Sequence, residues 1–121
     1  MPRDRINMLL KPIANDLKEI ESLIKQTRSG VKTPLRAMLT YSLTGGKRLR
    51  PALIMLTGNL FKVQRRKLHV LAAAIEVLHS ATLIHDDLVD DALLRRGHKT
   101  LNAVWLPGAA VLAGDFLLAR S

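Results

Sequence analysis

Residues 64–91 read QRRKLHVLAAAIEVLHSATLIHDDLVDD, the longest stretch of the chain with helical character. The run Ala72-Ala73-Ala74 consists of strong helix formers, and Leu, Ile and Val recur throughout the stretch. Gly and Pro are found at the edges of such segments rather than inside this one. The sequence therefore predicts one long helix that begins at about Gln64 or Arg65 and ends at about Asp91.

The segments on either side of this stretch also have helical patterns. From Ile6 to about Lys25, apolar residues recur every three or four positions, which is typical of an amphipathic helix that begins or kinks at Pro12. Thr33 is predicted to cap the next helix, with Pro34 at its first position. That helix is predicted to end at Gly45-Gly46, and further helices are predicted from Pro51 to about Leu60 and from Ala109 to about Ala119. We expect an all-α fold, a helical bundle that residues 1–121 form as one unit.

The composition excludes several classes of site. The 121 residues include 19 Lys+Arg and 10 Asp+Glu, for a net charge of +9, and no Cys, so disulfides, thiolate zinc sites and thiol nucleophiles are excluded. A charge-driven nucleic-acid or membrane-surface binder is less favoured, because aromatics make up only 3% and offer no stacking platform. The longest uncharged apolar stretch, 103–114, is interrupted by Pro107-Gly108 and is shorter than the roughly 20 residues that span a bilayer. We expect a cytoplasmic protein with no nucleic-acid partner and no membrane span.

Acidic residues gather near the end of the long predicted helix. Four of the ten acids fall within six consecutive residues. On a helix, Asp86 and Asp90 lie one turn apart on the same face, and His79 lies on the same stripe seven residues before Asp86. Like charges in this arrangement repel, and the C-terminal pole of a helix favours cations rather than anions. Local rules broken in this way are typical of a functional site.

A divalent cation would relieve both unfavourable effects. Magnesium takes hard oxygen ligands, commonly one or two carboxylates together with substrate phosphates and water. The alternative is a solvated acidic helix end that Arg95 and Arg96 neutralise. His85 would point about 100° away from Asp86 on a helix, so we expect a packed or capping histidine there rather than a metal ligand.

A basic loop, Gly45-Gly46-Lys47-Arg48-Leu49-Arg50-Pro51, joins two of the predicted helices. Its glycines allow the backbone to approach a ligand closely. Lys47 and Arg50 flank the start of the following helix, whose free N–H groups favour an anion. The loop lacks the P-loop pattern, and the alternative is a helix C-cap followed by solvated charge. Together with the aspartates, the loop predicts a site for an anionic ligand that is held partly by cations and partly through metal.

Four motifs agree in order and spacing with those of a known family. They occupy Gly45–Pro51, Glu76–Asp90, Arg95–Thr100 and Leu112–Leu118. From about Thr33 onward the chain resembles the trans-prenyltransferases, or polyprenyl diphosphate synthases. This resemblance implies an all-α isoprenoid synthase fold around a deep cavity, usually in a homodimer. It also implies a transferase of isoprenoid biosynthesis that condenses isopentenyl diphosphate with an allylic diphosphate and releases diphosphate.

The resemblance further implies roles for individual residues. Asp86 and Asp90 would bind Mg²⁺ that bridges the allylic diphosphate, and Asp87 of the same motif would support them. Arg95 would grip the allylic diphosphate. The diphosphate of isopentenyl diphosphate would be held by Lys47, Arg50, His79 and Arg96.

The chain departs from the family in one respect. Members carry a second aspartate-rich motif in their C-terminal half, whereas the only acid after Asp91 here is Asp115, which we expect to be structural and near the start of the last helix. We therefore expect residues 1–121 to be the N-terminal part of a polyprenyl synthase, inactive in isolation. The rest of the site would come from the missing half or from a partner chain. The alternative is a small non-catalytic subunit of a heteromeric prenyl diphosphate synthase.

Overall fold

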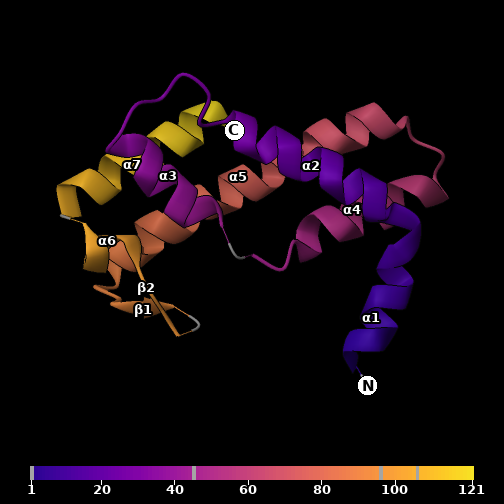
Figure 1. Ribbon diagram of the computed structural model, residues 1–121, viewed down its shortest axis with the longest axis horizontal. Helices are drawn as coiled ribbons and strands as arrows, with labels where there is room; N and C mark the ends of the chain where they lie inside the picture. The colour runs from indigo at the N-terminus through magenta and orange to yellow at the C-terminus, as the bar shows by residue number, and fades with distance from the viewer. Residues whose placement is uncertain (1, 45, 96, 106) are drawn as a thin grey trace. The chain divides into compact units, whose positions relative to one another are not determined.

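The computed structural model describes residues 2–44, 46–95, 97–105 and 107–121 (Figure 1). The chain is 76% helical with one small two-stranded sheet, which confirms the predicted all-α class. The elements are, in chain order, α1 (Pro2–Leu10), the 3-10 helix η1 (Lys11–Ile13), α2 (Ala14–Gln26), α3 (Leu35–Leu43), α4 (Leu49–Leu60), α5 (Arg65–Val89), β1 (Leu94–Arg95), β2 (His98–Lys99), α6 (Leu101–Val104) and α7 (Pro107–Arg120).

The chain divides into two compact units, and the boundary between them crosses α5. The first unit comprises Met1–Ile24 and Lys47–Glu76, and the second comprises Lys25–Gly46 and Val77–Ser121. Helices make up most of both units. The prediction that residues 1–121 form one all-α unit stays a prediction.

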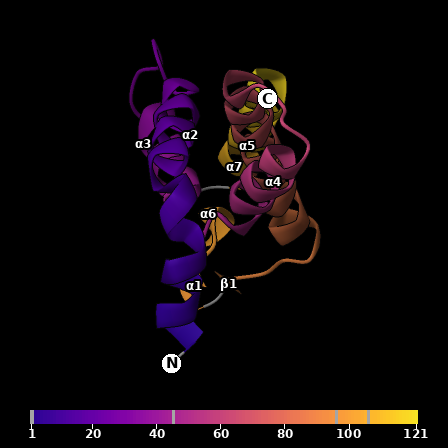
Figure 2. The ribbon, with the colours of Figure 1, turned by 90° about the vertical axis from the view of Figure 1, so that its right-hand side faces the viewer.

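The first unit has a core of apolar side chains from η1, α2, α4 and the first part of α5. Its fully or nearly fully buried members include Ile13, Ile20, Met55, Leu68 and Ala72. Pro12 lies in η1, between α1 and α2, which confirms the predicted break. The helix is interrupted there because proline has no N–H to continue its hydrogen bonds. A Cβ atom at Gly58 would overlap the side chain of Leu68, so this glycine allows α4 and α5 to pack closely (Figure 2).

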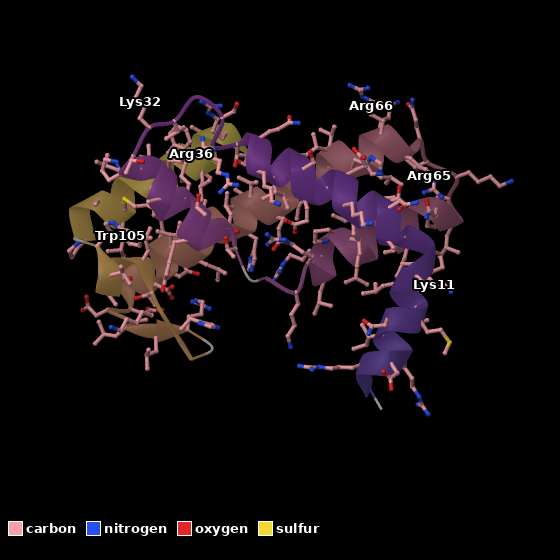
Figure 3. The ribbon with its side chains drawn as sticks, in the orientation of Figure 1. Lys11, Lys32, Arg36, Arg65, Arg66 and Trp105 are labelled. Atoms are coloured by element: carbon pink, nitrogen blue, oxygen red, sulfur yellow. The ribbon has the colours of Figure 1, made fainter. Side chains whose placement is uncertain are left out.

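A buried carboxylate joins α2 to α5 within the first unit. Arg65, which is labelled in Figure 3, donates from Nη1 to Asp16 Oδ2 at 2.5 Å. His69 Nε2 lies 2.7 Å from Asp16 Oδ1. Burial alone would raise the pKa of Asp16, but its hydrogen bonds with His69 and Arg65 bring the pKa below its ordinary value. Asp16 is therefore ionised at neutral pH and links the two helices.

The second unit is built on α3, α6, α7 and the second part of α5. Helix α3 contacts α6 and α7. Tyr41 of α3 meets Trp105, labelled in Figure 3, edge to face with ring centroids 5.4 Å apart, and its hydroxyl donates to Lys99 O at 2.5 Å. Helix α7 buries Ala110, Ala113 and Leu117 and leaves other apolar side chains exposed. The second unit therefore leaves part of the apolar surface of α7 uncovered.

Several predicted boundaries are wrong. Helix α3 begins at Leu35 with Pro34 as its N-cap residue and no side-chain cap, so Thr33 is not the cap. The same helix ends at Leu43 rather than at Gly45-Gly46, and Gly45 lies outside the described residues. Helix α5 ends at Val89, two residues before the predicted end.

The segment after α5, for which no helix or strand was predicted, contains a short hairpin. Strands β1 and β2 are antiparallel, with Leu94 opposite Lys99 and Arg95 opposite His98. Helix α6 follows directly and was absent from the predicted set. Strands of two residues are too short for an alternating pattern to appear in the sequence.

Among the described residues, α5 is the one helix that could cross a membrane by length and composition, with an 18-residue window of mean hydropathy 1.4. Of that window 44% is buried, and the core helix of a soluble protein passes the same test. The expectation of no membrane span considers only residues 103–114 and stays a prediction.

Candidate functional site

The acidic end of α5, which comprises Asp86, Asp87 and Asp90, presents two exposed carboxylates. The N–H of Asp90 donates to Asp86 O at 2.9 Å, so the helical turn continues through Asp90 and places the two residues one turn apart as predicted. Both residues are exposed. Among the described residues, neither makes an ion pair within 4.0 Å. Two like charges are thus held one helical turn apart, and no cation of the described residues is in direct contact with them.

This pair fits a hard divalent cation. Magnesium commonly takes one or two protein carboxylates and completes its octahedron with water and phosphate oxygens. Within the described ranges, no three His, Asp or Glu side chains come together as a metal site. The two exposed carboxylates would therefore leave most coordination positions to water or to a bound phosphate. The roles of Asp86 and Asp90 as magnesium ligands stay a prediction.

Backbone hydrogen bonds fix the point at which α5 ends. Asp91 adopts the left-handed conformation, with φ of 50°. Its N–H donates to Leu88 O at 3.2 Å, and the N–H of Ala92 donates to Asp87 O at 2.9 Å, which is the Schellman pattern of a helix C-terminus. Ala92 O in turn accepts from Thr100 Oγ1 at 2.7 Å and from Asn102 Nδ2 at 3.1 Å. The acidic end is therefore tied to the segment that carries β2 and α6.

Asp87 differs from its two neighbours because it is buried and paired. Arg95 of β1 donates from Nε to Asp87 Oδ1 at 3.0 Å and to Oδ2 at 3.2 Å, and from Nη2 to Oδ1 at 2.6 Å. These bonds raise the pKa of the Arg95 guanidinium above its ordinary value, partly against the effect of burial, and Asp86 and Asp90 add to the rise. The Arg95 side chain is still 41% exposed. Asp87 therefore orients Arg95 instead of joining the exposed pair.

This geometry supports only part of the alternative in which Arg95 and Arg96 neutralise the acidic helix end. Arg95 neutralises Asp87, and not Asp86 or Asp90 by direct contact. Arg96, the second cation of that alternative and a predicted diphosphate ligand, lies outside the described residues. His79 is half-buried on α5, and its carbonyl accepts from Thr82 Oγ1 at 2.7 Å.

His85 and Asp115 are partners in packing α5 against α7. His85 Nε2 lies 3.1 Å from Asp115 Oδ1 and 3.4 Å from Val111 O. A Cβ atom at Gly114 would overlap the His85 ring. The structure places His85 packed against α7, as predicted. Asp115 lies in the second half of α7 and not near its start, and its structural role stays a prediction.

The basic start of α4, which comprises Lys47, Arg48 and Arg50, belongs to the first unit. Lys47 and Arg50 are exposed, as expected for residues that would bind an anion. Arg48 occupies the N-cap position in the left-handed conformation, with φ of 57°, and its side chain points inward. A left-handed L-residue costs about 1–2 kcal/mol, so other contacts must hold Arg48 there.

Those contacts involve Glu21 and Glu76, neither of which was among the predicted site residues. Arg48 Nε donates to Glu21 Oε1, and Arg48 Nη1 donates to Glu76 Oε1 at 3.2 Å. Arg50 Nη1 lies 3.9 Å from Glu76 Oε2. One signal could have identified Glu76: it is the only acid in a long apolar run of α5, and a buried charge of this kind needs a partner. Nothing in the sequence points to Glu21.

Comparisons with known proteins identify similar sequences. A family model described as "Polyprenyl synthetase" matches residues 32–121. The chain is 40% identical to an all-trans-nonaprenyl-diphosphate synthase (geranyl-diphosphate specific) of Rhodobacter capsulatus, over 93% of this chain and 35% of the relative. It is 36% identical to heptaprenyl diphosphate synthase component 2 of Geobacillus stearothermophilus, over 90% of this chain and 34% of the relative.

The fold agrees with solved structures as well. A crystal structure of polyprenyl synthase from Caulobacter crescentus CB15, complexed with calcium and isoprenyl diphosphate, aligns with a TM-score of 0.84. Its sequence is 35% identical over 93% of this chain and 34% of that chain. The helical architecture is therefore that of the isoprenoid synthases. The chain spans about a third of the length of these relatives.

Proposed function

The chain belongs to the polyprenyl synthetase family, and on this premise we propose that it takes part in condensing isopentenyl diphosphate with an allylic diphosphate. In that reaction the allylic C–O bond breaks, a C–C bond forms, and a proton and diphosphate are released. The observation that carries the proposal is the exposed pair Asp86 and Asp90 beside Arg95, which Asp87 orients. A site of this kind suits a leaving group whose negative charge develops in the transition state.

We assign magnesium to Asp86 and Asp90. Their hard oxygens and their position one turn apart suit an ion that also binds substrate phosphate. When bound, the ion would neutralise charge on the diphosphate leaving group. The calcium in the Caulobacter structure is another hard cation that takes oxygen ligands, which supports an ion of this class.

Arg95 is assigned to the allylic diphosphate. Its bonds to Asp87 use Nε and Nη2, and its side chain remains 41% exposed, so part of the guanidinium faces away from Asp87. An arginine that is already oriented loses less freedom when it binds a phosphate. Asp87 would act by holding this orientation.

The second diphosphate, that of isopentenyl diphosphate, is assigned to Lys47, Arg50, His79 and Arg96. The exposure of Lys47 and Arg50 at the start of α4 supports their part in this role. An arginine can bind a phosphate through two N–H groups, whereas a lysine supplies a point charge. The assignment of Arg96 to this diphosphate rests on the family resemblance alone.

Two thirds of the relatives' length has no counterpart in this chain. We propose that a second aspartate-rich motif, supplied by further sequence or by a partner chain, completes the site in a homodimer or a heteromer, and that residues 1–121 are inactive in isolation. The relative called "component 2" supports a multi-chain arrangement. A cytoplasmic location is part of the same proposal.

The test uses the binding of geranyl diphosphate, an allylic diphosphate, by calorimetry with and without magnesium. We expect Asp86→Ala to abolish the increase in affinity that magnesium causes. The matched control is Asp91→Asn, which removes one nearby exposed charge and tolerates the left-handed backbone. The assignment would be contradicted by an equal magnesium effect in Asp86→Ala and the control.

The alternative is a small non-catalytic subunit that pairs with a full-length synthase. The name "component 2" of the Geobacillus relative is the observation that raises it. Recovery of a larger synthase with the tagged chain, together with unchanged synthase activity after Asp86→Ala and Lys47→Ala, would favour this alternative. Loss of activity in both variants would favour a direct part in the reaction.

A further inference from the structure

Glu76 is a buried carboxylate that stands between two arginines of the basic start of α4. Its Oε1 accepts from Arg48 Nη1 at 3.2 Å. Its Oε2 is buried and has no hydrogen-bond donor among the described residues, and Arg50 Nη1 lies 3.9 Å from it. A buried carboxylate is held in place only when cations compensate its charge. Arg48 supplies this compensation at one oxygen, and Arg50 is the cation nearest to the other among the described ion pairs.

Arg48 and Arg50 have different surroundings, although they are two residues apart. Arg48 is enclosed between Glu21 and Glu76 and is only 14% exposed. Arg50 approaches Glu76 with one nitrogen, 3.9 Å from Oε2, and 45% of its side chain is exposed. Arg48 is therefore part of the interior. Arg50 has one end near a buried anion and the rest of its guanidinium toward solvent.

We propose that Glu76 is a positioning residue for diphosphate binding and that it acts through Arg50. It would hold one edge of the Arg50 guanidinium so that the opposite edge is presented to the diphosphate of isopentenyl diphosphate. This inference rests on the proposed function of Arg50. A guanidinium can contact a carboxylate on one edge and a phosphate on another, whereas a lysine ammonium has no second edge.

The direction of the effect separates positioning from simple electrostatics. Glu76 is negative, so its charge alone repels a diphosphate, and its removal would strengthen binding. If Glu76 orients Arg50, its removal weakens binding instead, because the guanidinium must be ordered when the ligand binds. The sign of the change in affinity for isopentenyl diphosphate therefore distinguishes the two explanations.

The experiment titrates isopentenyl diphosphate into the 121-residue chain by calorimetry. We expect Glu76→Gln to weaken binding by about tenfold. The matched control is Glu21→Gln, which removes a contact of Arg48 but none of Arg50, and we expect it to change the affinity by less than about twofold. Unfolding curves of both variants register any purely structural effect.

A double-mutant cycle tests the route through Arg50. With Arg50→Gln already present, Glu76→Gln should cause no additional loss of affinity. If Glu76→Gln does not fold, Arg50→Lys serves instead, since it leaves Glu76 in place and should itself weaken binding by about tenfold. Wild-type affinity in Arg50→Lys would overturn the inference.

The outcomes separate this inference from the proposed function. If the wild-type chain does not bind isopentenyl diphosphate, the assignment of Lys47 and Arg50 fails, and the inference fails with it. If the wild-type chain binds and Glu76→Gln binds equally well or more tightly, the positioning role alone is overturned.

Discussion

The acidic end of α5 and the basic start of α4 have the same arrangement of exposed and buried charged groups, but their exposed charges are opposite. Each exposes two like charges and places a buried carboxylate behind them that holds an arginine: Asp87 holds Arg95, and Glu76 holds Arg48. Each also contains a residue other than glycine in the left-handed conformation, Asp91 or Arg48. In both regions the exposed charges stand in the sequence motifs, and the supporting carboxylate is buried.

The two regions differ in what stabilises the left-handed residue. At Asp91 the compensation comes from backbone hydrogen bonds of the helix end, which any residue can make. At Arg48 it comes from the side chain, through ion pairs with Glu21 and Glu76. The same backbone conformation therefore depends on the main chain in one region and on a specific side chain in the other.

Replacement of Arg48 by glycine should have the largest effect. Arg48→Gly relieves the backbone strain but leaves the buried Glu76 without its hydrogen-bonded cation, and we expect the free energy of unfolding to fall by about 3 kcal/mol. Urea denaturation measures the change. Arg48→Lys is the control and should retain part of the stability, because the positive charge remains. A stabilising effect of Arg48→Gly would mean that the side-chain contacts contribute nothing.

The next effect concerns the buried carboxylate of the other region. Asp87→Asn should lower the free energy of unfolding by about 2 kcal/mol, since it breaks a two-pronged ion pair whose arginine is partly screened by solvent. Asp86→Asn is the matched control. Asp86 is exposed and near another anion, so its neutralisation should leave stability unchanged or slightly higher. Equal destabilisation in both variants would erase the distinction between buried and exposed aspartates.

The first unit should lose stability in acid because of Asp16. Its pKa is lower in the folded chain than in the unfolded chain, so its contribution to stability is present above the ordinary carboxyl pKa and is lost as the pH falls through the folded value. Asp16→Asn should cost about 1.5 kcal/mol at pH 7. The effect is measured by denaturing the wild type and Asp16→Asn at intervals of about one pH unit between about pH 2 and 7. If the variant loses stability in acid as steeply as the wild type, Asp16 is not the responsible group.

The smallest expected effect is a gain. Asp91→Gly should raise the free energy of unfolding by about 0.5–1 kcal/mol, because glycine adopts the left-handed conformation at little steric cost and the capping bonds belong to the backbone. Thermal denaturation measures the change, and Asp91→Asn should lie near the wild type. A loss of stability in Asp91→Gly would show that the Asp91 side chain has a structural role.

Much of the fold could be predicted because helices repeat their pattern locally. The spacing of apolar residues identified α2, and a composition of helix formers and apolar residues identified α5. Pro12 marked the break before α2. The end of α5 was placed two residues too late, since a Schellman end formed by Asp91 has none of the glycine that usually signals it. The hairpin at 94–99 was missed because its strands are too short to have a period.

The exposed charges of the site and the buried Asp87 could be predicted from the motifs, whereas the buried contacts of Arg48 could not. Asp86, Asp90, Lys47 and Arg50 stand in recognisable motifs and are exposed, as ligand-binding side chains should be. The pairing of Arg48 with Glu21 and Glu76 joins residues 27 and 28 positions apart, and no local pattern encodes such a contact. A lone charge in an apolar run, such as Glu76, is the one sequence feature that indicates it.

The most direct test compares the two regions in one protein. Calorimetric titration of the wild-type chain with geranyl diphosphate and with isopentenyl diphosphate, each with magnesium and with a chelator, gives four affinities. We predict that magnesium raises the affinity for geranyl diphosphate by at least about tenfold, because carboxylates hold that ligand through the ion, and changes the affinity for isopentenyl diphosphate by less than about twofold, because cations hold it directly. The same magnesium response for both ligands would contradict the division of labour between the acidic end of α5 and the basic start of α4.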